Sequence, residues 1–363
     1  MTGFAYFRLP GRRQVVLIEQ TADEPQTLES IEELSGRDGF VVAPFESAST
    51  QPLVIIRPDV VRVFGEMSQL ETLQSVTPFA MSWTASSETM VSFDAGQVPR
   101  REDYAHDFAL FHAALTARRF DKLVLARCAV VNTGPSSPTP LQLFCRACQS
   151  YPQQFVALVY TQQSGLWLVA TPEILLESEG EQWHTMALAG TMRLNDGEQA
   201  HWSAKNIEEQ RIVARYIDHV LQPFASDVRE EGPRTSRAGG VVHLRSDFRF
   251  TLFNNARVGT LLQALHPTPA VCGLPKEEAR RFILANEHSP RSYYSGFMGP
   301  LCFDDSEGRE PLSTHLYVTL RCMQLLPGAC RLYAGGGLLR ESTEAQEWQE
   351  TEDKMQTMRR CLF

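Results

Sequence analysis

The 363-residue sequence lacks several features that would place it in common protein classes. No window approaches about 18 consecutive apolar residues, which excludes a membrane-spanning helix. Lys and Arg total 34 against 43 Asp and Glu, so the net charge of −9 leaves no basic excess for general nucleic-acid binding. The start of the chain lacks the charged, apolar and small-residue regions of a signal peptide. We therefore expect a cytoplasmic globular protein that binds neither nucleic acid nor a membrane.

The usual metal and nucleotide motifs are also missing. Cys145 and Cys148 form the single C-x-x-C pair, without a second Cys or His pair at zinc-ligand spacing. The pair falls in an apolar run with helical spacing, which predicts buried thiols rather than metal ligands. No G-x-x-x-x-G-K-[ST] sequence occurs, and the glycine run at 335–337 lacks the spacing of a dinucleotide site. Nothing in the sequence resembles a nucleophilic triad.

What is present is a long series of strands and helices. Residues 1 to about 80 read as short strands (5–8, 14–19, 40–44 and 53–58), and a polar connector follows at 84–99. Beyond them we predict helices at 101–118, 203–221, 256–265, 276–285 and 343–361, and strands at 122–131, 155–160, 166–170, 183–188, 317–323 and 330–334. The tight turn at 162–165 joins two strands that must be antiparallel. This order predicts an α+β fold with large antiparallel sheets and outer helices. Residues 1–100 are taken as the N-terminal β-rich part of the same domain, and residues 101–363 as the functional region.

Two residues are candidates for acid and base chemistry. Strand alternation places Lys122, Val124 and Ala126 on one face. A lysine at the head of a strand ordinarily faces solvent, but a partly desolvated one is able to act as a base. Glu173 follows Pro172 on a stiff bend, where it is either a surface carboxylate or a well-positioned acid.

Carboxylates on two distant helices are candidates for a metal site. Glu208 and Glu209 lie near the start of one predicted helix, where the helix dipole alone would favour them. Glu347, Glu350 and Lys354 share one face of the last helix, where Glu350 and Lys354 have the spacing of an ordinary ion pair. If the two helices meet, their carboxylates would instead form an oxygen-ligand site suited to Mg²⁺.

Two further features suit an anionic ligand. The backbone amides of the 335–337 glycine run are able to approach an anion closely. Arg321, in the strand predicted at 317–323, is able to pair with a carboxylate through two hydrogen bonds.

Seven ordered segments of the chain together resemble the chorismate-utilising enzymes, and among these the isochorismate synthases. They are residues 121–127 (DKLVLAR), 170–173 (ATPE), 187–191 (ALAGT), 205–209 (KNIEE), 265–270 (LHPTPA), 333–337 (YAGGG) and 347–351 (EWQET). The resemblance runs from about residue 121 to the C-terminus, and the N-terminal third carries no matching motif. It implies that residues 101–363 are a chorismate-binding catalytic region within the α+β fold of that family.

The resemblance also implies a role for each site residue. Lys122 would activate a water for attack at C2 of chorismate, while Glu173 would protonate the C4 hydroxyl as it leaves. Glu209 and Glu350 would bind Mg²⁺, and Glu347 would act through a bound water. The implied substrate-binding residues are Gly190, Thr191, His243, Ala270, Arg321, Tyr333, Gly335 and Lys354. Chorismate would be the partner of a chain that is a monomer or a weak dimer.

Several alternatives remain open at this point. Salicylate synthases share the lysine and add a pyruvate elimination, whereas ammonia-using relatives typically carry Gln in place of Lys122 or Lys in place of Ala189. Cys272, Gly336 and Gln210 stand where Gly, Ala and His are common in the family. A non-catalytic chorismate-binding protein on the same fold is a further possibility, although such a protein has no need of both acid and base. The pathway served, whether menaquinone, siderophore or salicylate supply, is not indicated.

Overall fold

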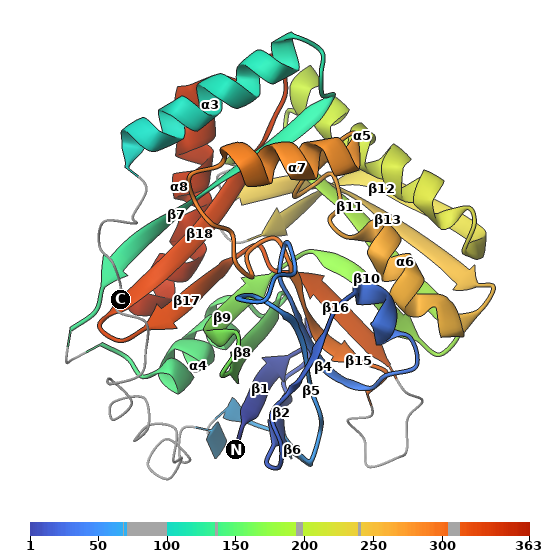
Figure 1. The fold of residues 1–363 in the computed structure, drawn as a ribbon, viewed down its shortest axis with the longest axis vertical. Coiled ribbons are helices and arrows are strands. Elements are labelled where there is room, and N and C mark those ends of the chain that lie inside the picture. The colour runs from blue at the N-terminus through green and yellow to red at the C-terminus, as the bar shows by residue number, and fades with distance from the viewer. Residues whose placement is uncertain (68, 71–99, 135–136, 194–198, 239–240, 304–312) are drawn as a thin grey trace.

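Two large antiparallel sheets, stacked face to face, form the centre of the molecule (Figure 1). The computed structural model describes residues 1–67, 69–70, 100–134, 137–193, 199–238, 241–303 and 313–363. The connector predicted at 84–99 lies outside these residues. Among the described residues, no helix is long and apolar enough to span a membrane.

Each sheet has nine strands within the described part of the chain. In spatial order, sheet A contains β14 (Gly273–Leu274), β7 (Lys122–Asn132), β18 (Ala329–Leu338), β17 (Cys322–Leu326), β9 (Gly165–Thr171), β8 (Phe155–Thr161), β1 (Gly3–Arg8), β2 (Val15–Gln20) and β6 (Val60–Phe64). Sheet B contains β12 (Ala225–Ala238), β13 (Val241–Leu252), β11 (Gln182–Arg193), β10 (Ile174–Glu179), β16 (Thr314–Val318), β15 (Phe297–Leu301), β4 (Gly39–Ala43), β5 (Leu53–Ile56) and β3 (Gln26–Leu28). The N-terminal strands therefore extend both sheets, while a boundary at residue 100 stays a prediction.

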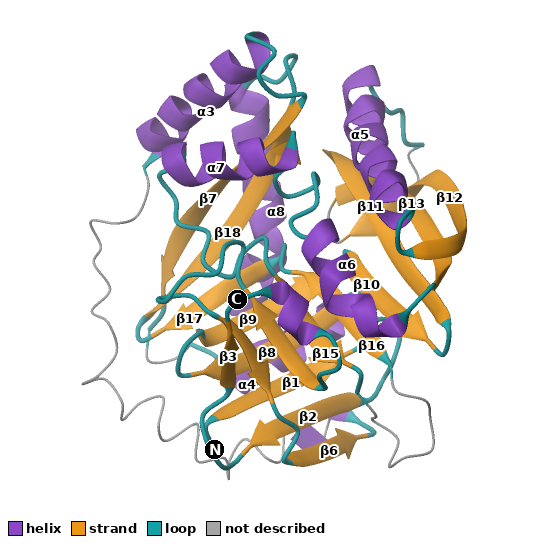
Figure 2. Cartoon of the chain, turned by 45° about the vertical axis from the view of Figure 1, so that its right-hand side comes forward, coloured by secondary structure: helices purple, strands orange, loops and turns teal. Residues whose placement is uncertain are grey.

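Helices cover the outer faces of both sheets (Figure 2). They are α3 (Arg101–Thr116), α4 (Pro140–Ser150), α5 (Ala204–Leu221), α6 (Val258–Leu265), α7 (Lys276–Asn286) and α8 (Glu344–Leu362), with short 3₁₀ turns η1 (Ile31–Leu34) and η3 (Asn255–Arg257). Helices α4 and α8 pack on sheet A, α5 and α6 pack on sheet B, and α3 and α7 pack beside β7. This layering confirms the predicted α+β architecture.

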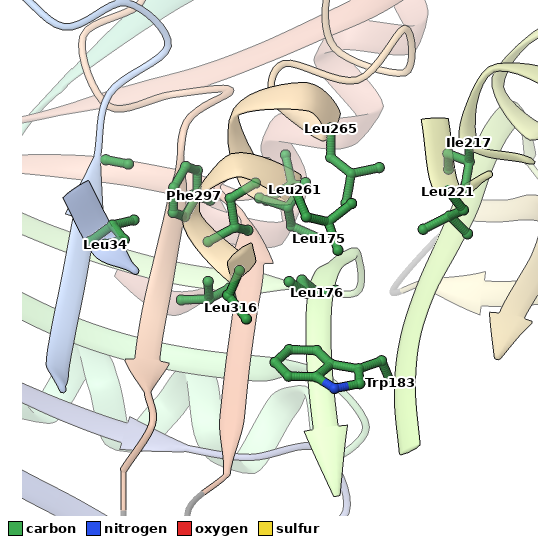
Figure 3. Packing of buried hydrophobic residues seen from close by; sticks show 14 of the residues in the cluster. Leu34, Leu175, Leu176, Trp183, Ile217, Leu221, Leu261, Leu265, Phe297 and Leu316 are labelled. Carbon is green, nitrogen blue, oxygen red and sulfur yellow. The ribbon is translucent and has the colours of Figure 1, made fainter. Parts of the chain in front are cut away.

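Strand alternation divides the apolar residues between the layers. In β9, Trp167 and Val169 point into the space between the sheets, while Leu166 and Leu168 face α4 and α8 outside. On the outer side of sheet B, leucines of α6 pack against residues such as Phe297 and Leu316 (Figure 3). Cys145 and Cys148 are buried thiols on α4, as their helical spacing predicts.

Three details differ from the sequence-based expectations. The strand predicted at 317–323 is two strands, β16 in sheet B and β17 in sheet A, because the chain crosses between the sheets at 319–321. Arg321 therefore lies in a crossover and not in a strand. The long charged strands β12 and β13 were not predicted, because polar residues interrupt the alternation of apolar and polar side chains by which a strand is recognised. The amphipathic pattern of residues 203–221 also predicts Ile207 on the apolar side of that helix, but in α5 Ile207 is exposed.

Candidate active site

The site begins where the chain crosses between the two sheets. One crossover, at Pro172 and Glu173, joins β9 to β10, and the other, at 319–321, joins β16 to β17. The crossovers are tied together by backbone hydrogen bonds from Val318 N to Glu173 O (2.9 Å) and from Ala170 N to Arg321 O (2.8 Å). Glu173 and Arg321 are thereby held close to one another, and both side chains are buried.

Lys122 begins β7 and faces the space between the sheets. Its neighbours Leu123 and Leu125 point outward into the apolar cluster under α3 and α7, as the predicted alternation requires. The side chain is fully buried, and Nζ lies 3.1 Å from Glu209 Oε1 of α5. This contact is an ion pair without hydrogen-bond geometry, so Nζ has no hydrogen-bond partner among the described residues. The ordinary expectation of a solvent-facing lysine is therefore wrong.

Gly337 is required for this ion pair. A Cβ at position 337 would lie 2.0 Å from Glu209 Oε1 and 2.9 Å from Lys122 Cε, distances shorter than any contact between such atoms. The glycine run therefore makes room for side chains of the site. An anion-binding role for its amides stays a prediction.

Glu173 is an acid that holds its proton at neutral pH. Burial raises its pKa to about 8, although the positive charges of Lys122, Arg321 and Lys354 act in the opposite direction. A carboxyl group with a pKa near neutrality is suited to give a proton to a leaving group. The structure thus overturns the surface-carboxylate interpretation of Glu173.

The carboxylates of α5 and α8 come to this same region. Burial acts to raise the pKa of Glu209, but the charges of Lys122, Lys205 and Lys354 hold it below its ordinary value, so Glu209 is ionised. Glu350 Oε1 lies 2.5 Å from Lys354 Nζ, which also donates a hydrogen bond to the Gly335 carbonyl oxygen at 2.9 Å.

Glu347 has one satisfied and one free oxygen. Its Oε1 accepts hydrogen bonds from Lys205 Nζ (2.5 Å) and from Ser342 Oγ (2.7 Å). Its Oε2 is buried and has no hydrogen-bond partner among the described residues. A Cβ at Gly336 would lie 2.8 Å from that free oxygen and 3.7 Å from Glu350 Oε1.

These carboxylates fit a Mg²⁺ ion. The donors are oxygen atoms alone, which Mg²⁺ prefers, and a buried carboxylate oxygen without a partner is costly unless a ligand or water satisfies it. In the described part of the chain, no three His, Cys, Asp or Glu side chains come together closely enough to hold a metal ion. Mg²⁺ is commonly held by only one or two carboxylates, with water and substrate oxygens completing its shell, so the two observations are compatible.

A histidine orients the buried arginine. His243 Nδ1 lies 3.1 Å from the Gly190 carbonyl oxygen, and Arg321 donates a hydrogen bond to His243 Nε2 at 3.0 Å. Burial and the charges of Arg321 and Lys354 lower the pKa of His243 well below its ordinary value, so the ring is neutral. Arg321 Nε has no hydrogen-bond partner within the described residues. Gly190 adopts φ +73° at a bulge of β11, where a Cβ would meet the Asn206 backbone at 2.9 Å.

The remaining predicted residues lie at the margins of this group. Thr191 is within 3.3 Å of His243 Nδ1, and Tyr333 stacks on Trp167 and Tyr294 between the sheets. Ala270 is partly buried against the core outside sheet B, and its role stays a prediction. Glu208 is half exposed and pairs with Arg215 on the same helix, which separates it from the buried carboxylates.

Lys205 and Ser342 contact Glu347, and neither is among the site residues predicted from the sequence. Lys205 is four residues before Glu209, a spacing that places both on one helix face and was an available signal. Ser342 precedes α8, and nothing in the sequence links it to Glu347.

The model of the chorismate binding enzyme family matches residues 60–363. The chain belongs to this family. The match begins well before residue 121, where the recognisable motifs start, and it includes β6 and α3.

Several members of the chorismate binding enzyme family are similar to this chain. Isochorismate synthase DhbC of Bacillus subtilis is 29% identical over 363 aligned residues, covering 92% of this chain and 86% of the relative. The salicylate biosynthesis isochorismate synthase of Pseudomonas aeruginosa is 35% identical over 254 residues, covering 67% of this chain and 51% of the relative. The crystal structure of DhbC from Bacillus anthracis has a TM-score of 0.79 at 22% identity and covers 99% of this chain and 96% of its own. This structural likeness confirms the fold.

Proposed function

We propose that this chain is an isochorismate synthase, which converts chorismate to isochorismate by adding water at C2 and removing the C4 hydroxyl. One observation carries the proposal: Glu173, an acid with a pKa of about 8, is buried within the electrostatic reach of the buried amine of Lys122. A protein that only binds chorismate has no need of such a pair. The similar chains named isochorismate synthases support the same reaction.

The two groups would perform complementary proton transfers. Lys122 takes a proton from water as the water oxygen forms its bond to C2. Glu173 gives its proton to the C4 hydroxyl as that carbon–oxygen bond breaks. The double bonds of the ring shift as the bond at C2 forms and the bond at C4 breaks. One water enters and one leaves, so the reaction is an isomerisation. Hydroxide is a poor leaving group, which is why the acid is needed.

Cations and backbone groups would hold the two carboxylates of chorismate. Arg321 has a free hydrogen-bond donor for a substrate carboxylate, because His243 accepts from one nitrogen of the guanidinium and Nε has no partner among the described residues. Lys354 supplies a second positive charge beside Gly335. We assign substrate contacts to these residues and to His243, Gly190, Thr191, Ala270 and Tyr333.

Glu209 and Glu350 would hold Mg²⁺, with Glu347 acting through a water. When bound, the ion would supply a positive charge for the ring carboxylate of the substrate. Glu209 lies on α5, which packs on sheet B, and Glu350 lies on α8, which packs on sheet A. Removing either carboxylate is therefore expected to impair metal binding without removing an element of the fold.

Product analysis tests the proposal. The purified protein is incubated with chorismate and Mg²⁺, and the products are identified by chromatography and NMR. We expect isochorismate without stoichiometric pyruvate. Pyruvate and salicylate in equal amounts would make the chain a salicylate synthase, and an aminated product formed only with ammonia would make it an ammonia-using relative. Chorismate binding without conversion would contradict an enzymatic role.

A further inference from the structure

Each of the three carboxylates assigned to the metal site has a lysine partner. Lys122 pairs with Glu209, and Lys354 pairs with Glu350. The third pair, Lys205 with Glu347, contains the lysine to which the proposed chemistry gives no task.

Lys205 and Ser342 approach one oxygen of Glu347 from different parts of the fold. Lys205 lies on α5, which covers sheet B, whereas Ser342 precedes α8, which covers sheet A. Ser342 is itself fixed, because its Oγ accepts a hydrogen bond from Leu339 N at 3.1 Å. Two donors from separate elements therefore define the position of Glu347 Oε1.

The other oxygen of Glu347 is left free by this arrangement. Oε2 is buried without a hydrogen-bond partner among the described residues, and it faces the space where Gly336 lacks a Cβ. The ammonium of Lys205 occupies Oε1, so it need not move for Oε2 to accept a hydrogen bond.

We propose that Lys205 and Ser342 are positioning residues, which clamp Glu347 so that its free oxygen holds a water of the bound Mg²⁺. The inference rests on the proposed function, because it takes Mg²⁺ as the ion of the site. Groups that orient a metal's surroundings in this way commonly change metal affinity by about 10- to 100-fold when removed.

A purely electrostatic role of Lys205 predicts the opposite change in Mg²⁺ affinity. An ammonium beside a metal site repels the incoming cation, so Coulomb's law alone predicts tighter Mg²⁺ binding when Lys205 is removed. A clamp predicts weaker binding. Ser342 carries no charge, so its removal isolates the positioning effect from the electrostatic one.

The experiment is a calorimetric titration of the full chain with MgCl₂ alone, without substrate or turnover. We expect Lys205→Met to weaken Mg²⁺ binding by about 10- to 100-fold. Ser342→Ala should weaken it by about fivefold, the equivalent of one hydrogen bond of about 1 kcal/mol. Arg215→Met is the matched control: it removes a cation from the same helix, where Arg215 pairs with the exposed Glu208, and it should leave the affinity unchanged.

A double-mutant cycle separates positioning from a general loss of structure. In a Glu347→Gln background, Lys205→Met should have no further effect on Mg²⁺ affinity, because the group that it positions is already altered. Tighter binding by Lys205→Met, or unchanged binding by both single variants, would overturn the inference. If Lys205→Met does not fold, Ser342→Ala alone decides the matter. Failure of the wild-type protein to bind Mg²⁺ would instead remove the proposed metal site, and this inference with it.

Discussion

Two clusters of buried charged residues in this molecule differ in how completely their polar atoms are satisfied. In the first, at the active site, Lys122 Nζ, Arg321 Nε and Glu347 Oε2 have no hydrogen-bond partner among the described residues. In the second, both ring nitrogens of His184 lie 2.7 Å from a carboxylate oxygen, of Glu177 on one side and of Asp247 on the other. We call this second group, with Arg245, the sheet B cluster.

The members of the sheet B cluster form hydrogen bonds with one another. Asp247 accepts hydrogen bonds from His184, Arg245 and Arg234. Burial lowers the pKa of His184, but hydrogen bonds to Asp247 and Glu177 outweigh it and raise the pKa above its ordinary value. The His184 ring therefore links β10, β11 and β13 through these hydrogen bonds.

The difference between the two clusters lies in the free-energy cost of their buried charges. An unsatisfied buried charge costs free energy, whereas a network in which every member is paired holds its strands in register. Under the proposed function, Mg²⁺ and chorismate would supply partners for the unsatisfied atoms of the active site. In the sheet B cluster, His184, Glu177, Asp247 and Arg245 have partners within the protein. Mutations in the active site should therefore lower turnover more than stability, and mutations in the sheet B cluster should lower stability more than turnover.

The largest expected effect is complete loss of turnover on removal of Mg²⁺. Treatment with EDTA should abolish activity, and MgCl₂ should restore it, because Glu209 and Glu350 are proposed to hold the ion. Glu209→Ala and Glu350→Ala should stay inactive after the addition, although both variants should still fold. Full turnover after thorough EDTA treatment would show that the unsatisfied oxygens do not serve a metal.

The next effect concerns the acid and the base. Lys122→Ala and Glu173→Gln should each lower turnover by about 10²- to 10⁴-fold, the usual contribution of a positioned proton-transfer group. Steady-state kinetics gives the turnover, and calorimetry with the inactive variants gives chorismate affinity, which should change far less. Near-normal turnover in both variants would mean that the chemistry is assigned to the wrong residues.

Asp247→Asn should show the reverse pattern in the sheet B cluster. Removing one charge from a buried, paired network typically costs about 3–5 kcal/mol of unfolding free energy, which urea denaturation measures. Turnover per folded molecule should change by less than about threefold, since Asp247 is on no proposed step. Loss of activity with unchanged stability would show that the two clusters are not separate in function.

The smallest effect is a pH dependence. The folded-state pKa of Glu173 is raised to about 8, so the proton-donating form predominates below that pH and is lost as pH rises through it. Turnover should therefore fall above about pH 8. For stability the sign is the same: a group with a raised pKa disfavours the folded state progressively as pH rises from its unfolded value to about 8.

The Glu173→Gln variant checks this sign. An amide does not ionise, so this variant should gain stability relative to wild type between pH 5 and pH 9, as followed by thermal unfolding. A constant stability difference over this range would contradict the burial of an ionisable Glu173.

The positions of the proposed catalytic residues in the fold were easier to predict from the sequence than the contacts that surround them. Alternation along 121–127 correctly separated Lys122 from Leu123 and Leu125, because a strand has a fixed period of two. The bend at Glu173 was also recognisable, from Pro172 between a strand and an apolar run. Local pattern gave the strand face of Lys122 and the bend at Glu173, but it did not predict that both side chains are buried.

Features that depend on long-range register were not predictable in this way. Arg321 was placed in a strand because the apolar run 316–323 does not reveal that the chain changes sheets there. The sheet B cluster unites residues from three strands, and Ser342 meets Glu347 only through the turn before α8. Such contacts follow from how the sheets assemble and not from the spacing of residues along one element.

The most direct test of the central claim is the reaction in H₂¹⁸O, analysed by mass spectrometry and NMR. If Lys122 activates a water for attack at C2 while Glu173 expels the C4 hydroxyl, isochorismate must carry one ¹⁸O atom at C2 from its first turnover. Isochorismate formed without label would mean that the hydroxyl migrates within the substrate, which would contradict the assignment of Lys122 as the base that activates water.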